Sequence, residues 1–434
     1  MGTRLLRSVL SKQDALVCLF NQGVVSVAGF ATCILISRQA PNGTAVFGIY
    51  YLGLSLVLFA RGFQQQLVST PYTLYHHRQS DSEMAAYRGS CLVHQFGFLA
   101  IALVYLIVQL VAASAGWLSP EVVPTLAILS IFMPAIMMRE VIRHYCFTHS
   151  ENLSVLGIDL AISVLQIGAL IALRFMGLLT GATAWFAVGA SCVLTLGYWY
   201  FKYGPEIQFQ RQRLAQDWKL NWSFGKWAVS GQFVGSLPTY LLPWLLLMAA
   251  GEEGTGLFGG CITLVGVANI FNMGMLNFLT PKAARVYVEE GNSGLRRLVS
   301  QMYLVFFVAV GSFALLLFFF GDAIAVKILN EDVQNYAGLQ VVLTLLAIAK
   351  IFEGFSHTAS GGLFAIERIK ENFWVDVILM VVTITAAILL IRPLGVVGAA
   401  WTTLIASATS AILRAILLAT FLREKPDVGG LVND

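Results

Sequence analysis

The sequence predicts an all-α polytopic membrane protein with about twelve transmembrane helices in two six-helix lobes. Apolar residues make up 58% of the 434 positions and charged residues 12%, and the mean hydropathy is +0.76. This balance leaves too little polar surface to cover a soluble globule of this length. Apolar runs of roughly 18 to 26 residues recur along the whole chain, and each can cross a hydrocarbon core of about 30 Å as a helix. Because the runs do not alternate, they are not barrel strands.

The apolar runs place the expected spans at 15–37, 46–68, 91–113, 121–138, 154–173, 178–201, 227–250, 256–280, 302–320, 337–363, 374–391 and 395–420. The first run follows Arg4, Arg7 and Lys12, as the apolar part of a secretion signal does. It is too long for such a segment and has no small-x-small cleavage site. We therefore expect it to be retained as the first spanning helix.

The distribution of basic residues predicts the orientation. Alternate connections, with the N-terminus and the tail from Arg414, hold 21 Lys and Arg residues, whereas the opposite connections hold four. The basic connections are 69–90, 139–153, 202–226, 281–301 and 364–373. Since basic connections stay in the cytoplasm, both termini are predicted to be cytoplasmic in a multi-pass cell (inner) membrane protein. The net charge of +4 reflects this topology, and no nucleic-acid partner is expected.

The connections are too short for an enzyme of the membrane. The longest expected outside connection, Gly321 to Tyr336, has about 16 residues, and a glycosyltransferase or ligase needs a larger extramembrane part. The six cysteines lie in or beside the spans without a CxxC or Cys/His cluster. We therefore expect no catalytic residue, cofactor, disulfide framework or metal site.

The two halves of the chain share motifs in the same order, offset by 210 to 218 residues. The pairs are GTAVFG (43–48) with GTGLFG (254–259), Pro71 with Pro281, Phe147 and Asp159 with Phe364 and Asp376, and RFMGLLTGATAW (174–185) with RPLGVVGAAW (392–401). This duplication predicts lobes 1–201 and 227–422, a cytoplasmic linker 202–226 and a tail 423–434. Two copies of the same orientation are related by an axis along the membrane normal, an arrangement that suits alternating access.

These residues also resemble a known family. The glycine-rich entry to the second span of each lobe, the prolines Pro71 and Pro281, and the run GVVGAAWTTLIA at 395–406 are similar to the polysaccharide-export branch of the multidrug/oligosaccharidyl-lipid/polysaccharide (MOP) exporter superfamily. The resemblance covers nearly the whole chain and says little about the substrate. It implies a flippase that moves a polyprenyl-pyrophosphate-linked oligosaccharide to the outer leaflet, with a polysaccharide polymerase as a further partner.

Three alternatives stay open. Cation-coupled multidrug antiporters of the same superfamily typically carry a carboxylate inside the first or seventh helix, but Asp14 precedes the first span and 227–250 contains no acid. The major facilitator fold has a Gly-Asp-Arg-Gly-Arg-like turn between spans two and three, which is missing here. A membrane scaffold without transport is the third alternative.

Two bases lie far from the ends of their spans, Arg61 in the second and Lys350 in the tenth. An ionised side chain at the bilayer centre costs at least about 2.5–3.5 kcal/mol, so each base must face protein, water or ligand. Arg61 can grip a pyrophosphate as a fork and Lys350 as a point charge. Glu353 and His357 share a helix face with Lys350 and are candidates for ion or proton coupling, and Glu353 is also a candidate for substrate binding.

Amide side chains on two corresponding spans are candidates for binding sugar hydroxyls, namely Gln65, one turn from Arg61 on the second span, and Asn269 and Asn272 on the eighth. Structural roles compete with these readings. Lys350 and Glu353 can neutralise each other, Arg61 can cap helix carbonyls, and Gln65 and His357 can be interfacial or packed. Asp159 and Asp376 fall early in their helices, where a carboxylate favours the helix dipole, so we expect a structural role for both.

Overall fold

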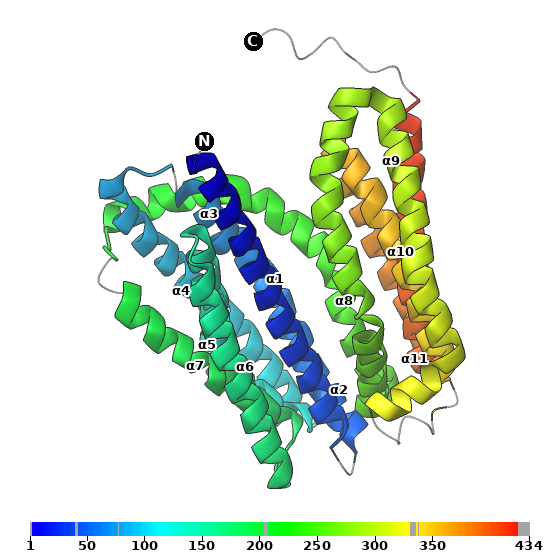
Figure 1. Cartoon of the computed structure of the whole chain (residues 1–434). Coiled ribbons are helices and arrows are strands. Elements are labelled where there is room, and N and C mark those ends of the chain that lie inside the picture. The colour runs from blue at the N-terminus through cyan, green and yellow to red at the C-terminus, as the bar shows by residue number, and fades with distance from the viewer. Residues whose placement is uncertain are drawn as a thin grey trace. The chain divides into compact units, whose positions relative to one another are not determined.

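The computed structural model describes residues 2–39, 42–76, 78–203, 207–329, 336 and 338–423. The described residues form helices and no strand. In chain order the elements are α1 (Gly2–Ser37), α2 (Gly43–Gln64), η1 (Gln65–Ser69), α3 (Thr70–His76), α4 (Asp81–Ser114), α5 (Val122–Thr148), α6 (Asn152–Phe175), α7 (Gly181–Tyr203), α8 (Arg211–Val265), α9 (Ala268–Ile328), α10 (Leu339–Ala365) and α11 (Ile369–Phe421) (Figure 1). They divide into two compact units, Met1–Ser236 and Leu237–Asp434, which we describe separately.

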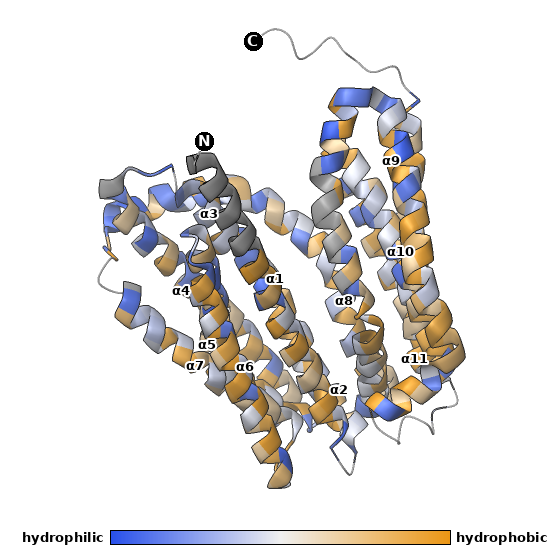
Figure 2. Cartoon of the chain, in the orientation of Figure 1, coloured by the Kyte–Doolittle hydropathy of each residue, from blue (hydrophilic) through white to orange (hydrophobic). Residues whose placement is uncertain are grey.

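Ten helices in the described part of the chain are long and apolar enough to cross a membrane. Hydrophobic residues run along the helices of both units, and hydrophilic residues gather toward helix ends (Figure 2). These observations confirm the all-α polytopic class. Three of the ten helices, α8, α9 and α11, have 55, 61 and 53 residues. α11 holds two expected spans, whereas the expected span 256–280 is divided between α8, which ends at Val265, and α9, which begins at Ala268. The number of twelve crossings and the internal repeat stay predictions.

A glycine interrupts each of these three long helices. Gly251 in α8, Gly291 in α9 and Gly395 in α11 have φ values of 69°, 66° and 53°. A Cβ atom makes this region unfavourable for other residues, whereas glycine adopts it at little cost. At Gly291 the chain reverses direction, so that α9 consists of two helical arms (Figure 1). The expected spans 374–391 and 395–420 lie largely on the two arms of α11.

The second apolar helix is longer than expected. The prediction ended it at residue 68, whereas α2 passes into the π-helical segment η1 and then into α3, giving a candidate span of Gly43–His76. Pro71 does not end the helix: it lies just after the π-helical segment η1, and the backbone is helical through Thr70 and on to His76. Insertions of π-helix occur frequently at functional sites.

One other expected boundary was wrong. The fourth span was expected to end at residue 138, but α5 continues to Thr148 because its charged residues there are buried. The expected end of the twelfth span, at residue 420, agrees with the end of α11 at Phe421. Arg414, which was counted with the cytoplasmic tail, is only 8% exposed within this helix. The orientation of the termini stays a prediction.

The expected linker is partly helical. Residues 211–226 form the beginning of α8 and belong to the first unit. The Tyr87 hydroxyl donates to Asn221 Oδ1 at 2.9 Å and thereby ties this segment to α4. The lobe boundaries 1–201 and 227–422 stay predictions.

In the first unit, an aromatic contact fixes α2 against α7. Trp185 is 2% exposed, its ring stacks on Tyr50 at 4.9 Å, and its Nε1–H donates to the Tyr50 carbonyl at 3.1 Å. In the second unit, a leucine-rich core joins α9, α10 and α11. Each unit thus holds its polar side chains on helices that are packed by apolar contacts.

Candidate functional site

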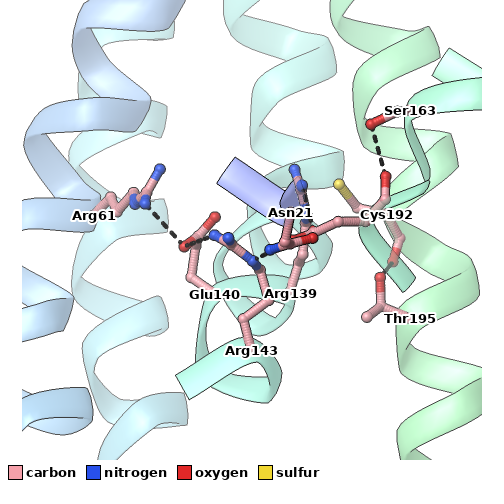
Figure 3. Close-up of polar contacts among 9 residues, drawn as sticks. Asn21, Arg61, Arg139, Glu140, Arg143, Ser163, Cys192 and Thr195 are labelled. Atoms are coloured by element: carbon pink, nitrogen blue, oxygen red, sulfur yellow. Dashed lines mark hydrogen bonds and ion pairs between the residues drawn. The ribbon is translucent and has the colours of Figure 1, made fainter. Parts of the chain in front are cut away.

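Arg61 projects from the last turn of α2 toward α5. Its Nη2 lies 3.2 Å from Glu140 Oε2, and the exposed fractions are 42% for the Arg61 side chain and 8% for that of Glu140 (Figure 3). The contact recorded for Arg61 is thus an ion pair with a carboxylate, and not the carbonyl cap considered from the sequence. Arg61 combines a partner within the protein with a substantial accessible surface.

Helix α5 supplies most of the charges around Glu140. Arg143 Nη1 lies 3.2 Å from Glu140, and Arg143 Nε donates to Asp159 of α6 at 2.8 Å. Arg139 Nη2 donates to the other oxygen of Asp159 at 2.7 Å. Asp159 is fully buried. We call Arg61, Arg139, Glu140, Arg143 and Asp159 the α5 charge cluster.

Asn21 of α1 also donates to Asp159, at 3.0 Å, so the cluster joins α1, α2, α5 and α6 (Figure 3). This role of Asp159 agrees with the structural role expected from the sequence. The cluster also explains why α5 continues past residue 138, since its charges are paired inside the protein and do not need water.

The α5 charge cluster is not electrically balanced. Three guanidinium groups meet two carboxylates, which leaves one positive charge in excess among these five residues. Arg139 and Arg143 are largely buried, with side-chain exposures of 15% and 9%, so Arg61 is the arginine of the cluster that a ligand can reach most easily. Chemically, this arrangement can bind an anion through the Arg61 guanidinium.

The glutamines that follow Arg61 differ in environment. Gln64 is buried and donates to the Met137 carbonyl at 2.7 Å and to Gln95 Oε1 at 3.2 Å. Gln65, the predicted sugar-binding residue, begins η1 and is exposed. Gln64 therefore fixes the helix against α4 and α5, and Gln65 is available to a ligand.

In the second unit, α10 brings the other predicted charges together. Lys350 Nζ lies 2.5 Å from Glu353 Oε2, and His357 Nε2 lies 3.6 Å from Glu353 Oε1. Lys350 is mostly buried, whereas Glu353 and His357 are about one-third exposed. The shared face is as predicted, and the structure favours the reading in which Lys350 and Glu353 neutralise each other.

The two predicted asparagines lie at the start of α9, and no contact with Lys350 is recorded for either of them. Asn269 is exposed. Asn272 is 2% exposed, and neither atom of its amide has a hydrogen-bond partner in the structure. A buried amide without a partner is energetically costly, so Asn272 stays a candidate for contact with a polar ligand or water.

Sequence reasoning missed a second buried arginine site. Arg414 of α11 lies 2.5 Å from Asp376 and donates to Asn372 at 2.8 Å and to Ser356 of α10 at 2.7 Å, with a further bond to Ser410. We call these five residues the Arg414 cluster. The predicted correspondence of Asp159 and Asp376 was the available signal, because a carboxylate inside a membrane helix requires a partner. For Arg139 and Arg143, the signal was their i, i+4 spacing.

The described residues contain no group of three or more His, Cys, Asp and Glu side chains that could hold a metal ion. The six cysteines are not paired with each other in disulfides.

No family model matches the sequence, and no curated protein matches it significantly. Solved structures are similar over most of the chain. An inward-facing multidrug resistance MATE family transporter of the MOP superfamily has a TM-score of 0.75 at 15% identity, covering 94% of this chain and 98% of the other. The lipid II flippase MurJ in an inward closed conformation has a TM-score of 0.72 at 14% identity, covering 93% and 87%.

This chain has the fold of the MOP superfamily transporters. A further member with this fold, a transporter from Pyrococcus furiosus described as having a binding pocket of reversed polarity, has a TM-score of 0.63 at 15% identity and covers 94% and 95%. Identities this low establish the fold alone. The MOP fold is shared by a multidrug transporter and a lipid flippase, so the substrate must be argued from the side chains of this chain.

Proposed function

We propose that this protein is an alternating-access membrane transporter that flips an anionic lipid-linked oligosaccharide, of the polyprenyl-pyrophosphate type, from the cytoplasmic to the outer leaflet. The MOP fold supports a transporter, since its solved members include a MATE transporter and the lipid II flippase MurJ. Transport of this kind needs no covalent chemistry, so the proposal is not of an enzyme.

The observation that supports an anionic substrate is the positive excess of the α5 charge cluster. Charges inside membrane helices are usually paired, and an unbalanced charge marks a place where a ligand supplies the balance. Arg61 is both part of this excess and 42% exposed. Its planar guanidinium suits the oxygens of a pyrophosphate, which it can bind through two parallel hydrogen bonds.

The remaining predicted residues have supporting roles in the proposal. Gln65 and Asn269 are exposed amides that can donate to and accept from sugar hydroxyls, and Asn272 is a buried amide without a partner. Lys350 is already paired with Glu353, so we assign it a smaller share of the substrate's charge. Outward movement of negative charge is favoured by an inside-negative potential, at about 2.3 kcal/mol per charge and 100 mV.

One observation favours a second function, a cation-coupled multidrug antiporter. Glu353 is about one-third exposed and lies between Lys350 and His357, an arrangement in which a carboxylate can exchange a proton or a cation. The two functions make opposite demands on the charges. A flippase of an anionic head depends on Arg61, and a cation antiporter depends on Glu353.

The experiment that tests the proposal is mass spectrometry of polyprenyl lipids from cells that lack the protein. We expect polyprenyl-pyrophosphate oligosaccharide to accumulate in these cells and in cells that carry Arg61→Gln. Wild type should restore the normal lipid pool, and Arg61→Lys should restore it in part, since Lys keeps the charge but not the two parallel hydrogen bonds. Arg285→Gln is the matched control, because Arg285 is an exposed arginine that pairs with Glu289 outside the α5 charge cluster.

An unchanged lipid pool in the null cells would exclude the flippase. Loss of drug efflux in Glu353→Gln, with normal efflux in Arg61→Gln, would then establish the antiporter. A protein for which neither variant affects either assay would be a membrane scaffold.

A further inference from the structure

Two adjoining hollows lie in the second unit beside the end of α11. One, of about 250 Å³, lies between α9 and α11, and the other, of about 460 Å³, is at the beginning of the second arm of α9. Arg296, Ser300 and Leu422 line both, so the hollows adjoin each other. Since a water molecule takes about 30 Å³ of liquid volume, both are large enough for a lipid headgroup or part of an acyl chain.

The lining of the hollows is divided into an apolar and a polar part. The apolar wall consists of Val299 and Tyr303 on α9 and of Ala415 and Ala419 on α11. Each pair is separated by four residues, so each forms a stripe on its helix, and the alanines leave space between the helices. The polar end is lined by Asn292, Ser293, Arg296, Arg297, Ser300 and Arg423.

The polar end carries a positive excess. Arg297 pairs with Glu290 at 3.7 Å, and both side chains are at least half exposed, so this pair is weak. Arg296 and Arg423 form no ion pair with a described carboxylate. Both are exposed. Two guanidinium groups therefore face the hollows without a described counter-ion.

The charges at the beginning of α11 lie close to its end, but they do not change the positive excess of the hollows. The Arg368 guanidinium lies over the Phe421 ring at 4.3 Å and pairs with Glu371 at 3.2 Å. This pair is neutral, so it leaves the excess on Arg296 and Arg423 unchanged.

The hollows lie at the depth where lipid headgroups are expected. The candidate span of α11 ends at Phe421, and Arg423 follows two residues later. Asn292 Nδ2 donates to the Leu422 carbonyl at 3.2 Å, which ties the end of α11 to α9. The basic end is therefore held at a membrane-helix terminus, and the apolar wall continues along the helices toward the hydrocarbon core.

We propose that these hollows bind an acidic phospholipid, whose phosphate contacts Arg296 and Arg423 and whose acyl chain lies along the apolar wall. Guanidinium groups bind phosphate oxygens as forks, and the Ser300 hydroxyl can add a hydrogen bond. The apolar wall favours a lipid over free phosphate. In the predicted orientation the site faces the cytoplasmic leaflet, which holds anionic lipids. This site is independent of the transported substrate.

Native mass spectrometry of the full-length protein in detergent, titrated with phosphatidylglycerol, tests the proposal. We expect the Arg296→Gln/Arg423→Gln double variant to bind the first phosphatidylglycerol about 30-fold more weakly than wild type, which corresponds to about 2 kcal/mol. The Arg296→Lys/Arg423→Lys variant should keep most of the affinity. Arg285→Gln, which removes an exposed arginine of α9 outside the hollows, should bind as wild type does.

Melting temperatures without added lipid show whether each variant is folded. Equal binding of phosphatidylcholine, or equal binding of phosphatidylglycerol by the double Gln variant, would overturn the proposal. A matching effect of inorganic phosphate, lost in the same variant, would show that the arginines bind free phosphate and not a lipid.

Discussion

The α5 charge cluster and the Arg414 cluster each neutralise an aspartate with arginine, but the arginines lie in different positions relative to the aspartate. Asp159 and Asp376 lie 217 residues apart, and the predicted repeat pairs them. Asp159 of α6 is neutralised by two arginines of the preceding helix α5, whereas Asp376, on the first arm of α11, is neutralised by Arg414 on the second arm, 38 residues further along the chain. One aspartate thus has its basic partners before it in the sequence, and the other has its partner after it.

The two clusters also differ in net charge. The Arg414 cluster pairs one arginine with one carboxylate, and α10 pairs Lys350 with Glu353. The α5 charge cluster has three arginines for two carboxylates, and one of them, Arg61, is accessible. Among these charged groups inside the helices, the positive excess thus belongs to the α5 charge cluster, whereas the Arg414 cluster and the Lys350–Glu353 pair are balanced.

The largest expected effect separates the two aspartates. Asp159→Asn leaves Arg139 buried without its carboxylate and Arg143 with Glu140 alone, and loss of one partner from a buried ion pair costs about 3–5 kcal/mol of stability. Asp376→Asn should cost less, about 1–3 kcal/mol, because the Asp376 side chain is 27% exposed and Arg414 keeps Asn372 and Ser356. Tryptophan fluorescence during heating of the detergent-purified variants measures the difference. Equal melting temperatures would contradict it.

The next effect separates the two bases in transport. Arg61→Gln should weaken the apparent affinity for the anionic lipid about 10- to 100-fold, as expected for loss of a hydrogen bond to a charged group worth about 1.5–3 kcal/mol. Lys350→Gln should lose less, because Glu353 already matches its charge. Flipping assays in proteoliposomes with a lipid-linked oligosaccharide measure both. A larger loss for Lys350→Gln would assign the substrate's charge to the second unit.

The smallest expected effect distinguishes the two glutamines, Gln64 and Gln65, that follow Arg61 in the sequence. Gln64→Ala should destabilise the protein by about 1–3 kcal/mol, since it removes the buried hydrogen bonds to the Met137 carbonyl and to Gln95 Oε1. Gln65→Ala should change stability by less than about 0.5 kcal/mol, because its side chain is exposed. Melting temperatures test the first effect. If Gln65 binds sugar hydroxyls, its loss will be seen in the flipping assay alone.

The sequence was sufficient to predict the helical membrane class and the polar face of α10. Both depend on local information, namely the length of apolar runs and the spacing of three residues on one helix. The Glu140 partner of Arg61 could not be predicted in this way. It comes from another helix, and its neighbours Arg139 and Arg143 had been placed in a connection because charge usually marks a helix end. Arg414 was counted with the tail for the same reason.

At the glycine breaks in α8, α9 and α11, a single residue joins two helical arms of the second unit, with no loop between them. Where one residue joins two helical arms, as at Gly291, an arm cannot shift along its axis unless the other follows or the joint itself rotates. Connections of ordinary length would let neighbouring arms slide independently. We therefore expect movements within this unit to be rotations about single residues, with the joined arms moving as rigid bodies.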